Sequence, residues 1–239
     1  MRRALAFLTP LGGARTPAPS ALAWFPIVGA IIGLALGGAW WGSERIWPKA
    51  LAAAVVVVAD LAITGMLHFD GLLDSADGLL AHMTRERRLA VMSEPTVGAF
   101  GMATGIGVLL LRWAALAAIA PNPVLLGAIW ACSRTAMAVT SAVIFYARSS
   151  GGLATAFLDG AGSRRNALVA AIVGTALTAV GLEWWNPVHG LIVIGCEVLG
   201  FVGVVWVAKR RLGGFTGDVL GAAGMVGETL ALLAAAGRW

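Results

Sequence analysis

Long apolar runs separated by short polar stretches fill the chain almost from end to end. Each run holds about 20 residues, which is enough for a helix to cross the hydrocarbon layer of a membrane. Because a backbone in lipid must satisfy its own hydrogen bonds, we predict that every run is helical. The approximate ranges of the seven predicted spans are Leu22–Gly42, Trp47–Met66, Val97–Ala120, Val124–Tyr146, Ala167–Trp185, Val188–Ala208 and Val219–Ala236. The pattern therefore predicts an all-α, polytopic membrane bundle, with residues 1–239 as one domain.

Lysine and arginine are distributed unevenly between the two ends of these predicted spans. Twelve fall on one side: Arg2, Arg3, Arg15, Arg85, Arg87, Arg88, Arg148, Arg164, Arg165, Lys209, Arg210 and Arg211. The other side has only Arg45, Lys49 and Arg238. Since cytoplasmic loops carry the excess of basic residues, the twelve-residue side is expected to face the cytoplasm from the inner membrane.

Composition supports the membrane interpretation. The chain is 59% hydrophobic and only 12% charged, with a mean hydropathy of +0.86, so it lacks the charged surface of a soluble domain. The net charge of +5 lies in loops between spans and does not indicate nucleic acid. Cys132 and Cys196 stand alone in apolar runs, where we expect small buried side chains rather than a disulfide or metal site.

The stretch His68–Gly78, HFDGLLDSADG, is the most acidic part of the chain. On a helix at 100° per residue, its three aspartates, Asp70, Asp74 and Asp77, fall within a wedge of about 60°. A second stripe beside them consists of Gly71, Ser75 and Gly78. We predict one helix with an acidic stripe, a small-residue stripe and an apolar face.

Three stacked carboxylates near a membrane repel one another unless a cation compensates them. Oxygen ligands select hard ions, so Mg²⁺ is the expected cation, and the glycine and serine stripe would let a phosphate-bearing substrate approach. His68 is either a further ligand or a structural residue. The alternative is an ordinary interfacial helix whose acids face water.

A second polar feature opens the last predicted span. Thr216 or Asp218 can cap a helix there, and Asp218 is also a candidate metal ligand. Gly217 shares one helix face with Glu228, and that face serves either close helix packing or ligand contact. Glu228 lies inside the span and is therefore expected to have a polar neighbour.

Arginines supply the opposite charge. Arg134 lies near the middle of the fourth span and needs a carboxylate or phosphate partner. Arg148 either reflects membrane topology or binds an anion together with the glycines that follow it, of which Gly152 is one. Arg112 is expected to snorkel towards the membrane surface. Carboxylates and arginines on one side of a membrane suit phosphoryl transfer, in which a carboxylate accepts a proton.

These motifs resemble a known family. HFDGLLDSADGLL, followed by RERRLAVMSEPTVGAFG, is similar to the signature of the adenosylcobinamide-GDP ribazoletransferases, or cobalamin-5'-phosphate synthases. The likeness continues through Ser133–Arg134, the segment Tyr146–Phe157 and GGFTGDVLGA at Gly213–Ala222. One departure is Met225, where other members carry an additional acid.

The resemblance implies a Mg²⁺-dependent inner-membrane enzyme that joins a GDP-activated corrinoid, adenosylcobinamide-GDP, to α-ribazole or its 5'-phosphate and releases GMP. It implies that Asp70, Asp74, Asp77 and Asp218 hold metal, with Asp77 as our choice of base. Arg134 or Arg148 would stabilise the charge on the leaving GMP. The small molecules and the lipid bilayer are the expected partners, and homo-oligomerisation stays open.

Two other functions remain open at this point. A CDP-alcohol phosphotransferase also clusters aspartates and glycines on a membrane helix, although its alanine–arginine step and second aspartate pair are missing from this chain. A proton- or cation-coupled transporter would place acids and arginines near the membrane midplane.

Overall fold

Helices account for the regular structure in the computed structural model, which describes residues 1–13, 16–148, 155, 157–158 and 160–238. The α-helices are α1 (Arg2–Leu8), α2 (Phe25–Ser43), α3 (Lys49–Ile63), α4 (Leu67–Leu80), α5 (Arg85–Val91), α6 (Ala99–Ala118), α7 (Pro123–Val143), α8 (Gly160–Trp185), α9 (Pro187–Leu212) and α10 (Gly217–Ala235). Two 3-10 helices, η1 (Pro10–Gly12) and η2 (Pro19–Trp24), lie near the N-terminus. The described residues form no β-sheet, which confirms the all-α prediction.

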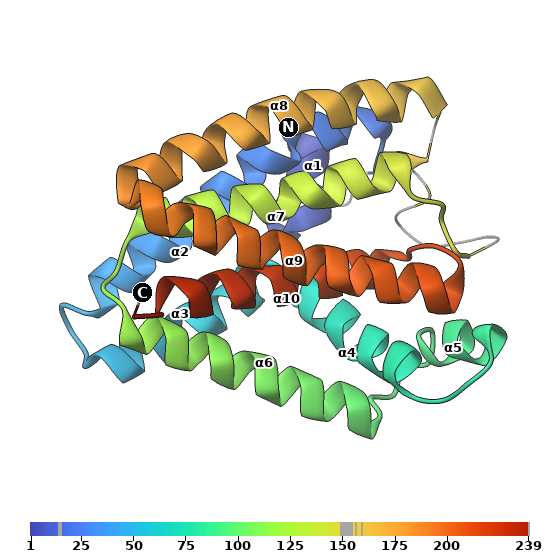
Figure 1. Ribbon diagram of the computed structural model, residues 1–239, viewed down its shortest axis with the longest axis horizontal. Coiled ribbons are helices and arrows are strands. Elements are labelled where there is room, and N and C mark those ends of the chain that lie inside the picture. Colours follow the sequence, from blue (N-terminus) through green and yellow to red (C-terminus); the bar gives the residue numbers. More distant parts are fainter. Residues whose placement is uncertain (14–15, 149–154, 156, 159, 239) are drawn as a thin grey trace.

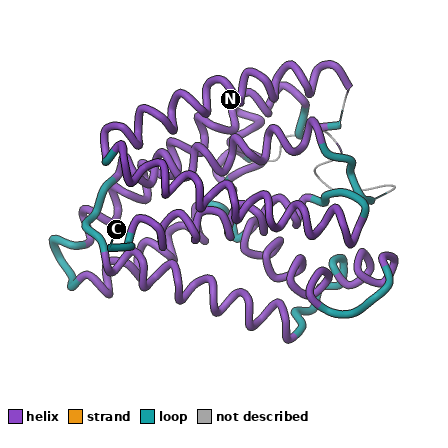
Figure 2. The backbone as a smooth tube through the Cα atoms, in the orientation of Figure 1, coloured by secondary structure: helices purple, strands orange, loops and turns teal. Residues whose placement is uncertain are grey.

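The long helices lie side by side along the long axis of the molecule (Figure 1). α2 packs on α7, which packs on α8, while α10 packs on both α9 and α4. α6 covers α3 and α4 from the other side. Loops lie mainly at the two ends of the bundle (Figure 2), as expected for helices that cross a membrane and return.

Among the residues that the structure describes, six helices are long and apolar enough to cross a membrane by themselves: Pro19–Ser43, Ala99–Ala118, Pro123–Val143, Ala161–Trp185, Pro187–Leu212 and Gly217–Ala235. The predicted span Trp47–Met66 is the exception. There the helix α3 has only 15 residues and is followed by α4 at an angle of 89°. The described chain therefore reaches seven spans only if this bent pair is one broken span.

The break between α3 and α4 has a backbone cause. Gly65 and Met66 both have positive φ, at 58° and 59°, and an α-helix cannot continue through left-handed residues. The side chain of Thr64 also bonds back to the carbonyl of Asp60, at 2.7 Å. The apolar pattern of the sequence does not reveal this break, because it shows which residues are apolar and not where the chain turns.

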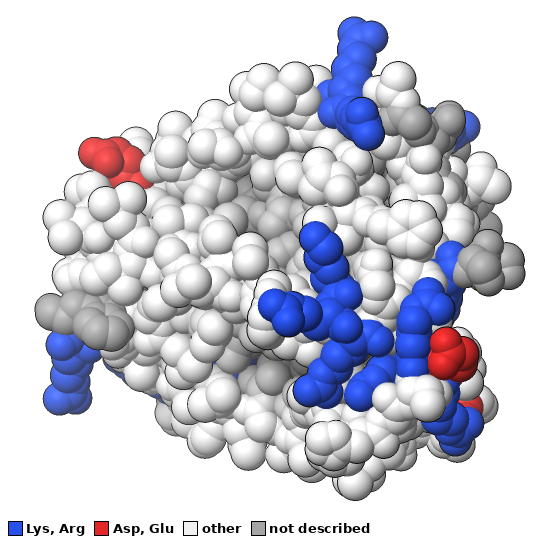
Figure 3. All heavy atoms as spheres, turned by 45° about the vertical axis from the view of Figure 1, so that its right-hand side comes forward, with Lys and Arg blue, Asp and Glu red and all other residues white. Residues whose placement is uncertain are grey.

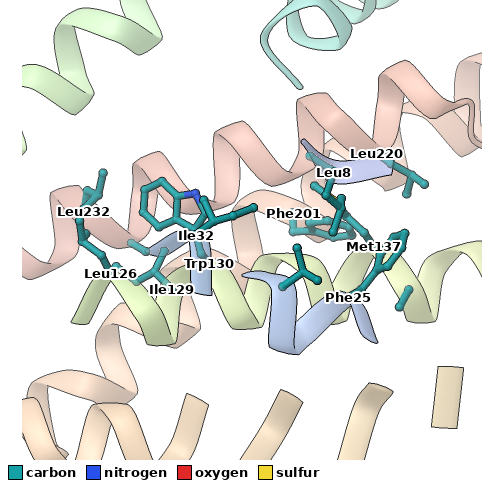
Figure 4. Close-up of a cluster of buried hydrophobic side chains, with 14 of the residues drawn as sticks. Leu8, Phe25, Ile32, Leu126, Ile129, Trp130, Met137, Phe201, Leu220 and Leu232 are labelled. Carbon is teal, nitrogen blue, oxygen red and sulfur yellow. The ribbon is translucent and has the colours of Figure 1, made fainter. Parts of the chain in front are cut away.

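Close contact between α2 and α7 forms the central part of the core. Three glycines on one face of α2 lie against the α7 backbone, and a Cβ atom at Gly33 would stand 2.2 Å from the carbonyl oxygen of Leu126. Small residues allow membrane helices to approach in this way. Figure 4 shows buried side chains from α2, α7 and α10 meeting here, Ile32, Trp130 and Leu232 among them.

The ends of the bundle differ in charge. Lys and Arg side chains gather over the end that carries α5 and the connection from α9 to α10 (Figure 3). Three of them, Lys209, Arg210 and Arg211, occupy the last turn of α9. We call this the basic end.

Candidate active site

The crossing of α4 and α10 brings the acidic stretch to the start of the last helix. A Cβ atom at Gly71 would stand 2.7 Å from the carbonyl oxygen of Asp218, and one at Gly221 would stand 3.0 Å from the Cα atom of His68. The two backbones are in contact at both positions because glycine has no side chain to hold them apart. Gly71 is thus used for helix packing instead of lying open to a substrate.

The first turn of α10 holds an aspartate that pairs with an arginine from the segment after α7. Thr216 is the N-cap, and its side-chain oxygen accepts a hydrogen bond from the amide of Val219. Asp218 is consequently free of the capping role, and it forms an ion pair with Arg148 at 2.9 Å. The side chains of both members are about a quarter exposed, at 26% and 22%.

Three carboxylates share this region. Asp74 of α4 is repelled by the charges of Asp70 and Asp218 and attracted by Arg148. Within the described part of the chain, however, no three His, Cys, Asp or Glu side chains are grouped closely enough to hold a metal ion by themselves. Any ion bound here would need ligands from water or substrate as well.

Asp77 points away from this group. Its two carboxylate oxygens accept hydrogen bonds from the amides of Gly98 and Gly101, at 2.7 and 2.8 Å. Gly98 is the N-cap of α6 and Gly101 lies in its first turn, and a glycine N-cap has no side chain to offer. Asp77 therefore caps α6 from α4 and neutralises its positive dipole end.

A cavity of about 280 Å³ opens beside the aspartates. Its polar lining includes His68, Asp70, Arg148, Gly217 and Asp218, all of them predicted from the sequence. The apolar lining comes from α1, α2, α7 and the segment before α8, together with Leu67 of α4 and Leu220 of α10. Three separate segments of the chain, namely α4, the stretch after α7 and the start of α10, thus supply the polar side of one cavity.

Tyr146 joins the cavity from the segment after α7. Its backbone pairs with Phe215 in an isolated parallel bridge, which ties the Arg148 segment to the start of α10. Burial raises the pKa of the Tyr146 phenol, although Arg148 opposes the shift. The phenol is therefore protonated at neutral pH and can donate a hydrogen bond.

A buried ion network lies deeper between the helices. Arg112 pairs with Asp60 at 2.6 Å and also with Glu228, and Arg134 pairs with Glu228 in turn. All four side chains are at most 7% exposed. The expected polar partners of Arg134 and Glu228 are thus each other, and both lie outside the residues that line the cavity.

The snorkelling prediction for Arg112 is wrong. This residue is 2% exposed and donates to Thr229 and Met225 in addition to the two carboxylates. The full set of acceptors keeps the guanidinium inside the bundle, because its departure would leave the buried carboxylate of Asp60 without an ion-pair partner.

Two further predicted residues are not found at the cavity in the described part of the chain. Ser75 is 3% exposed and lines a separate apolar hollow between α4, α6, α9 and α10. Gly152 lies outside the described residues.

Comparison with known proteins identifies the family. Residues 1–236 match the family described as cobalamin-5-phosphate synthase. The chain belongs to this family. An adenosylcobinamide-GDP ribazoletransferase of Chlorobaculum tepidum is 41% identical over 227 residues, covering 91% of this chain and 85% of the relative. A protein of the same name from Bradyrhizobium diazoefficiens is 37% identical over 247 residues, covering 99% and 92%. No solved structure matches the chain.

Sequence reasoning did not single out three further residues of this cobalamin-5-phosphate synthase family member, of which Phe157 lines the cavity and two are acids buried elsewhere. Asp60 is a lone acid inside a predicted span, the same signal that singled out Glu228, and it could have been found. Glu197 of α9 is also buried, at 1% exposed. Phe157 lines the cavity, but an apolar residue in a glycine-rich loop carries no such signal.

Proposed function

We propose that this protein catalyses the transfer named for its relatives, joining adenosylcobinamide-GDP to α-ribazole or its 5'-phosphate with release of GMP. The observation that carries the proposal is the meeting of Asp70, Asp218 and Arg148 at one cavity. These residues come from three separate segments, and together they offer both signs of charge to a diphosphate. Membership of the cobalamin-5-phosphate synthase family supports the same reaction.

The reaction is proposed to take place at the cytoplasmic face of the inner membrane. Arg148 also donates to the carbonyl of Met92, the C-cap residue of α5, so the polar side of the cavity adjoins the basic end. Basic residues mark the cytoplasmic ends of membrane helices. The diphosphate of the donor is charged and the ribose hydroxyl of the acceptor is polar, and both suit a site that opens towards the cytoplasm.

Mg²⁺ is proposed as the cofactor, and the donor set fits it. Asp70, Asp74 and Asp218 offer hard carboxylate oxygens, and their mutual repulsion would be relieved by a divalent ion. Mg²⁺ commonly takes a few carboxylates and completes its shell with water and substrate phosphates, which agrees with a carboxylate group too loose to form a closed site. When bound, the ion would neutralise charge on the diphosphate of the donor.

The protein's own residues have distinct parts in the transfer. Asp70 or Asp74 accepts the proton of the attacking ribose hydroxyl through an oxygen that holds no ion. The ribose oxygen forms a new bond to the phosphorus nearer the cobinamide. The bond from that phosphorus to the oxygen bridging the diphosphate breaks, and GMP leaves with the bridging oxygen. Arg148 stabilises the charge that develops on GMP. Asp77 holds α4 on α6 and thereby sets the position of the carboxylates.

The test uses purified protein in detergent with both substrates and Mg²⁺, and it measures GMP. We expect GMP release from the wild type and a loss of at least about 100-fold in Asp74→Asn and Asp218→Asn, the range seen when one charge-stabilising group is removed. Glu94→Gln is the matched control, because Glu94 is a surface carboxylate paired only with Arg87. Full GMP release by Asp74→Asn at saturating Mg²⁺ would show that the metal assignment is wrong.

The same preparation separates the competing functions. CDP-diacylglycerol should not replace the GDP-activated donor, whereas a CDP-alcohol phosphotransferase would use it. Proton-coupled uptake into vesicles without any GMP release would identify a transporter instead.

A further inference from the structure

The cavity consists of two chemically different parts. Asp70, Asp218 and Arg148 form its polar side, and the rest of the lining is largely apolar. We call the residues Phe7, Phe25, Phe157, Met137 and His68 the aromatic end. We propose that the aromatic end binds the planar base of the nucleoside acceptor, with His68 bonded to a ring nitrogen. This inference rests on the proposed function.

Three phenylalanines form the wall of the aromatic end. Phe7 is stacked on Phe25 with ring centroids 5.8 Å apart, and Phe157 meets both rings edge-on at 4.8 and 5.6 Å. The rings come from α1, α2 and the segment before α8, so tertiary packing alone assembles them. Figure 4 shows Phe25 beside Met137 of α7, which lines the same cavity. Aromatic walls of this kind favour a flat, polarisable ring by stacking and edge contacts.

His68 gives the aromatic end one specific polar group. The residue is 5% exposed, and its Nδ1 atom is buried without a hydrogen-bond partner. A buried polar atom left unpaired is costly, so it is expected to be paired in the bound state. The ring nitrogen or N–H of an aromatic base can pair with a neutral imidazole. A lipid chain has no such group, and the observation therefore favours a base over an acyl chain.

The size of the cavity limits what can enter. Its volume of about 280 Å³ lies just below the range of roughly 300–1,000 Å³ that accommodates drug-sized ligands. A base with its ribose can fit, but a corrinoid macrocycle cannot enter as well. With the base at the aromatic end, the ribose points to Asp70 and Asp218, and the bulky donor remains at the mouth. This order places the attacking hydroxyl beside the carboxylates.

The first experiment measures binding of α-ribazole to the purified protein without donor or Mg²⁺, using the fluorescence of its benzimidazole base. Phe157→Leu and His68→Leu should each raise the dissociation constant for α-ribazole by about tenfold or more. This is the effect of losing one stacking partner or one buried hydrogen bond. His68→Gln should recover part of the loss, because it can still form a hydrogen bond. Mn²⁺ binding, used as a spectroscopic probe of the carboxylates, should not change in these variants.

Phe201→Leu is the matched control. Phe201 is a buried aromatic residue of α9, 3% exposed, that does not line the cavity, and its variant should bind α-ribazole as the wild type does. A second measurement on the wild type covers the case in which a variant fails to fold. The free benzimidazole base should compete with α-ribazole, whereas ribose 5-phosphate should compete weakly or not at all.

The outcomes separate this inference from the proposed function. If GMP is released but Phe157→Leu and His68→Leu bind α-ribazole normally, or the free base does not compete, the base lies elsewhere and the inference is overturned. If α-ribazole binds with the expected variant pattern but no GMP forms, the proposed reaction is wrong and the aromatic end stands as a base-binding pocket. If Phe201→Leu weakens binding equally, the effect is general packing and the inference is overturned.

Discussion

Replacing Arg112 by methionine should destabilise the protein more than any surface substitution. Arg112 joins α3, α6 and α10, because its guanidinium donates to Asp60, Glu228, Thr229 and the carbonyl of Met225. In the variant, Glu228 keeps Arg134 as a partner. Asp60 is left with a single bond from Trp130, at 3.2 Å, while it is 5% exposed.

The expected magnitude follows from this uncompensated charge. Breaking a buried ion pair by removing one partner costs about 3–5 kcal/mol, and here the side chain of the remaining carboxylate, Asp60, is only 7% exposed. For a chain of this size, about 1 kcal/mol corresponds to roughly 2–4 °C in unfolding temperature. We therefore expect the unfolding temperature of Arg112→Met in detergent to fall by roughly 6–20 °C.

Two further variants make the reasoning refutable. Arg87→Met removes an arginine from an exposed pair with Glu94 and should shift the unfolding temperature by no more than about 2 °C. Adding Asp60→Asn to Arg112→Met removes the stranded charge and should restore about half of the lost stability. A loss below about 1 kcal/mol in the single variant, or a larger loss in the double variant, would refute the account.

Three other predictions follow from the helix contacts. Asp77→Asn should lower stability by about 1–2 kcal/mol in thermal unfolding. The asparagine side chain has only one acceptor oxygen in place of the two that bind the backbone amides of Gly98 and Gly101. Unchanged unfolding would contradict the capping role. Gly221→Ala should reduce GMP release by at least about tenfold while the protein remains inserted in the membrane. The added methyl group meets the His68 backbone and separates α4 from α10. Wild-type turnover would argue against a close crossing. Met66→Gly should stabilise the protein by about 1 kcal/mol, since φ is 59° at this exposed residue; destabilisation in the same unfolding assay would contradict it.

Much of the polar chemistry is visible in the sequence because it violates the apolar pattern. Glu228 and Arg134 are charges inside predicted spans, and the need for a polar neighbour follows from the cost of charge in lipid. The structure confirms that neighbour for each of them. The aspartates of α4 were predicted to share one helix face by local geometry alone, and α4 is helical over Leu67–Leu80.

The sequence could not say where those groups point. Asp77 belongs to the same stripe as Asp70, yet it caps α6, because the first turn of α6 happens to lie against that end of α4. Arg112 was expected at the surface, since no pattern along one helix reveals a carboxylate on another. The break after Ile63 was missed because left-handed backbone at Gly65 leaves hydropathy unchanged.

The sequence by itself determined the helical membrane architecture, the basic end and the set of charged residues that must find partners. These properties depend on composition and on periodicity within one helix, where neighbours along the chain are neighbours in space. Only the tertiary structure decided which charges pair in the core, which line the cavity, and that Phe7, Phe25 and Phe157 form its aromatic end. These pairings and positions depend on how the helices cross. Contacts such as that of Gly71 with the Asp218 backbone set the crossing, and they join residues too far apart in the sequence for a local pattern to reveal.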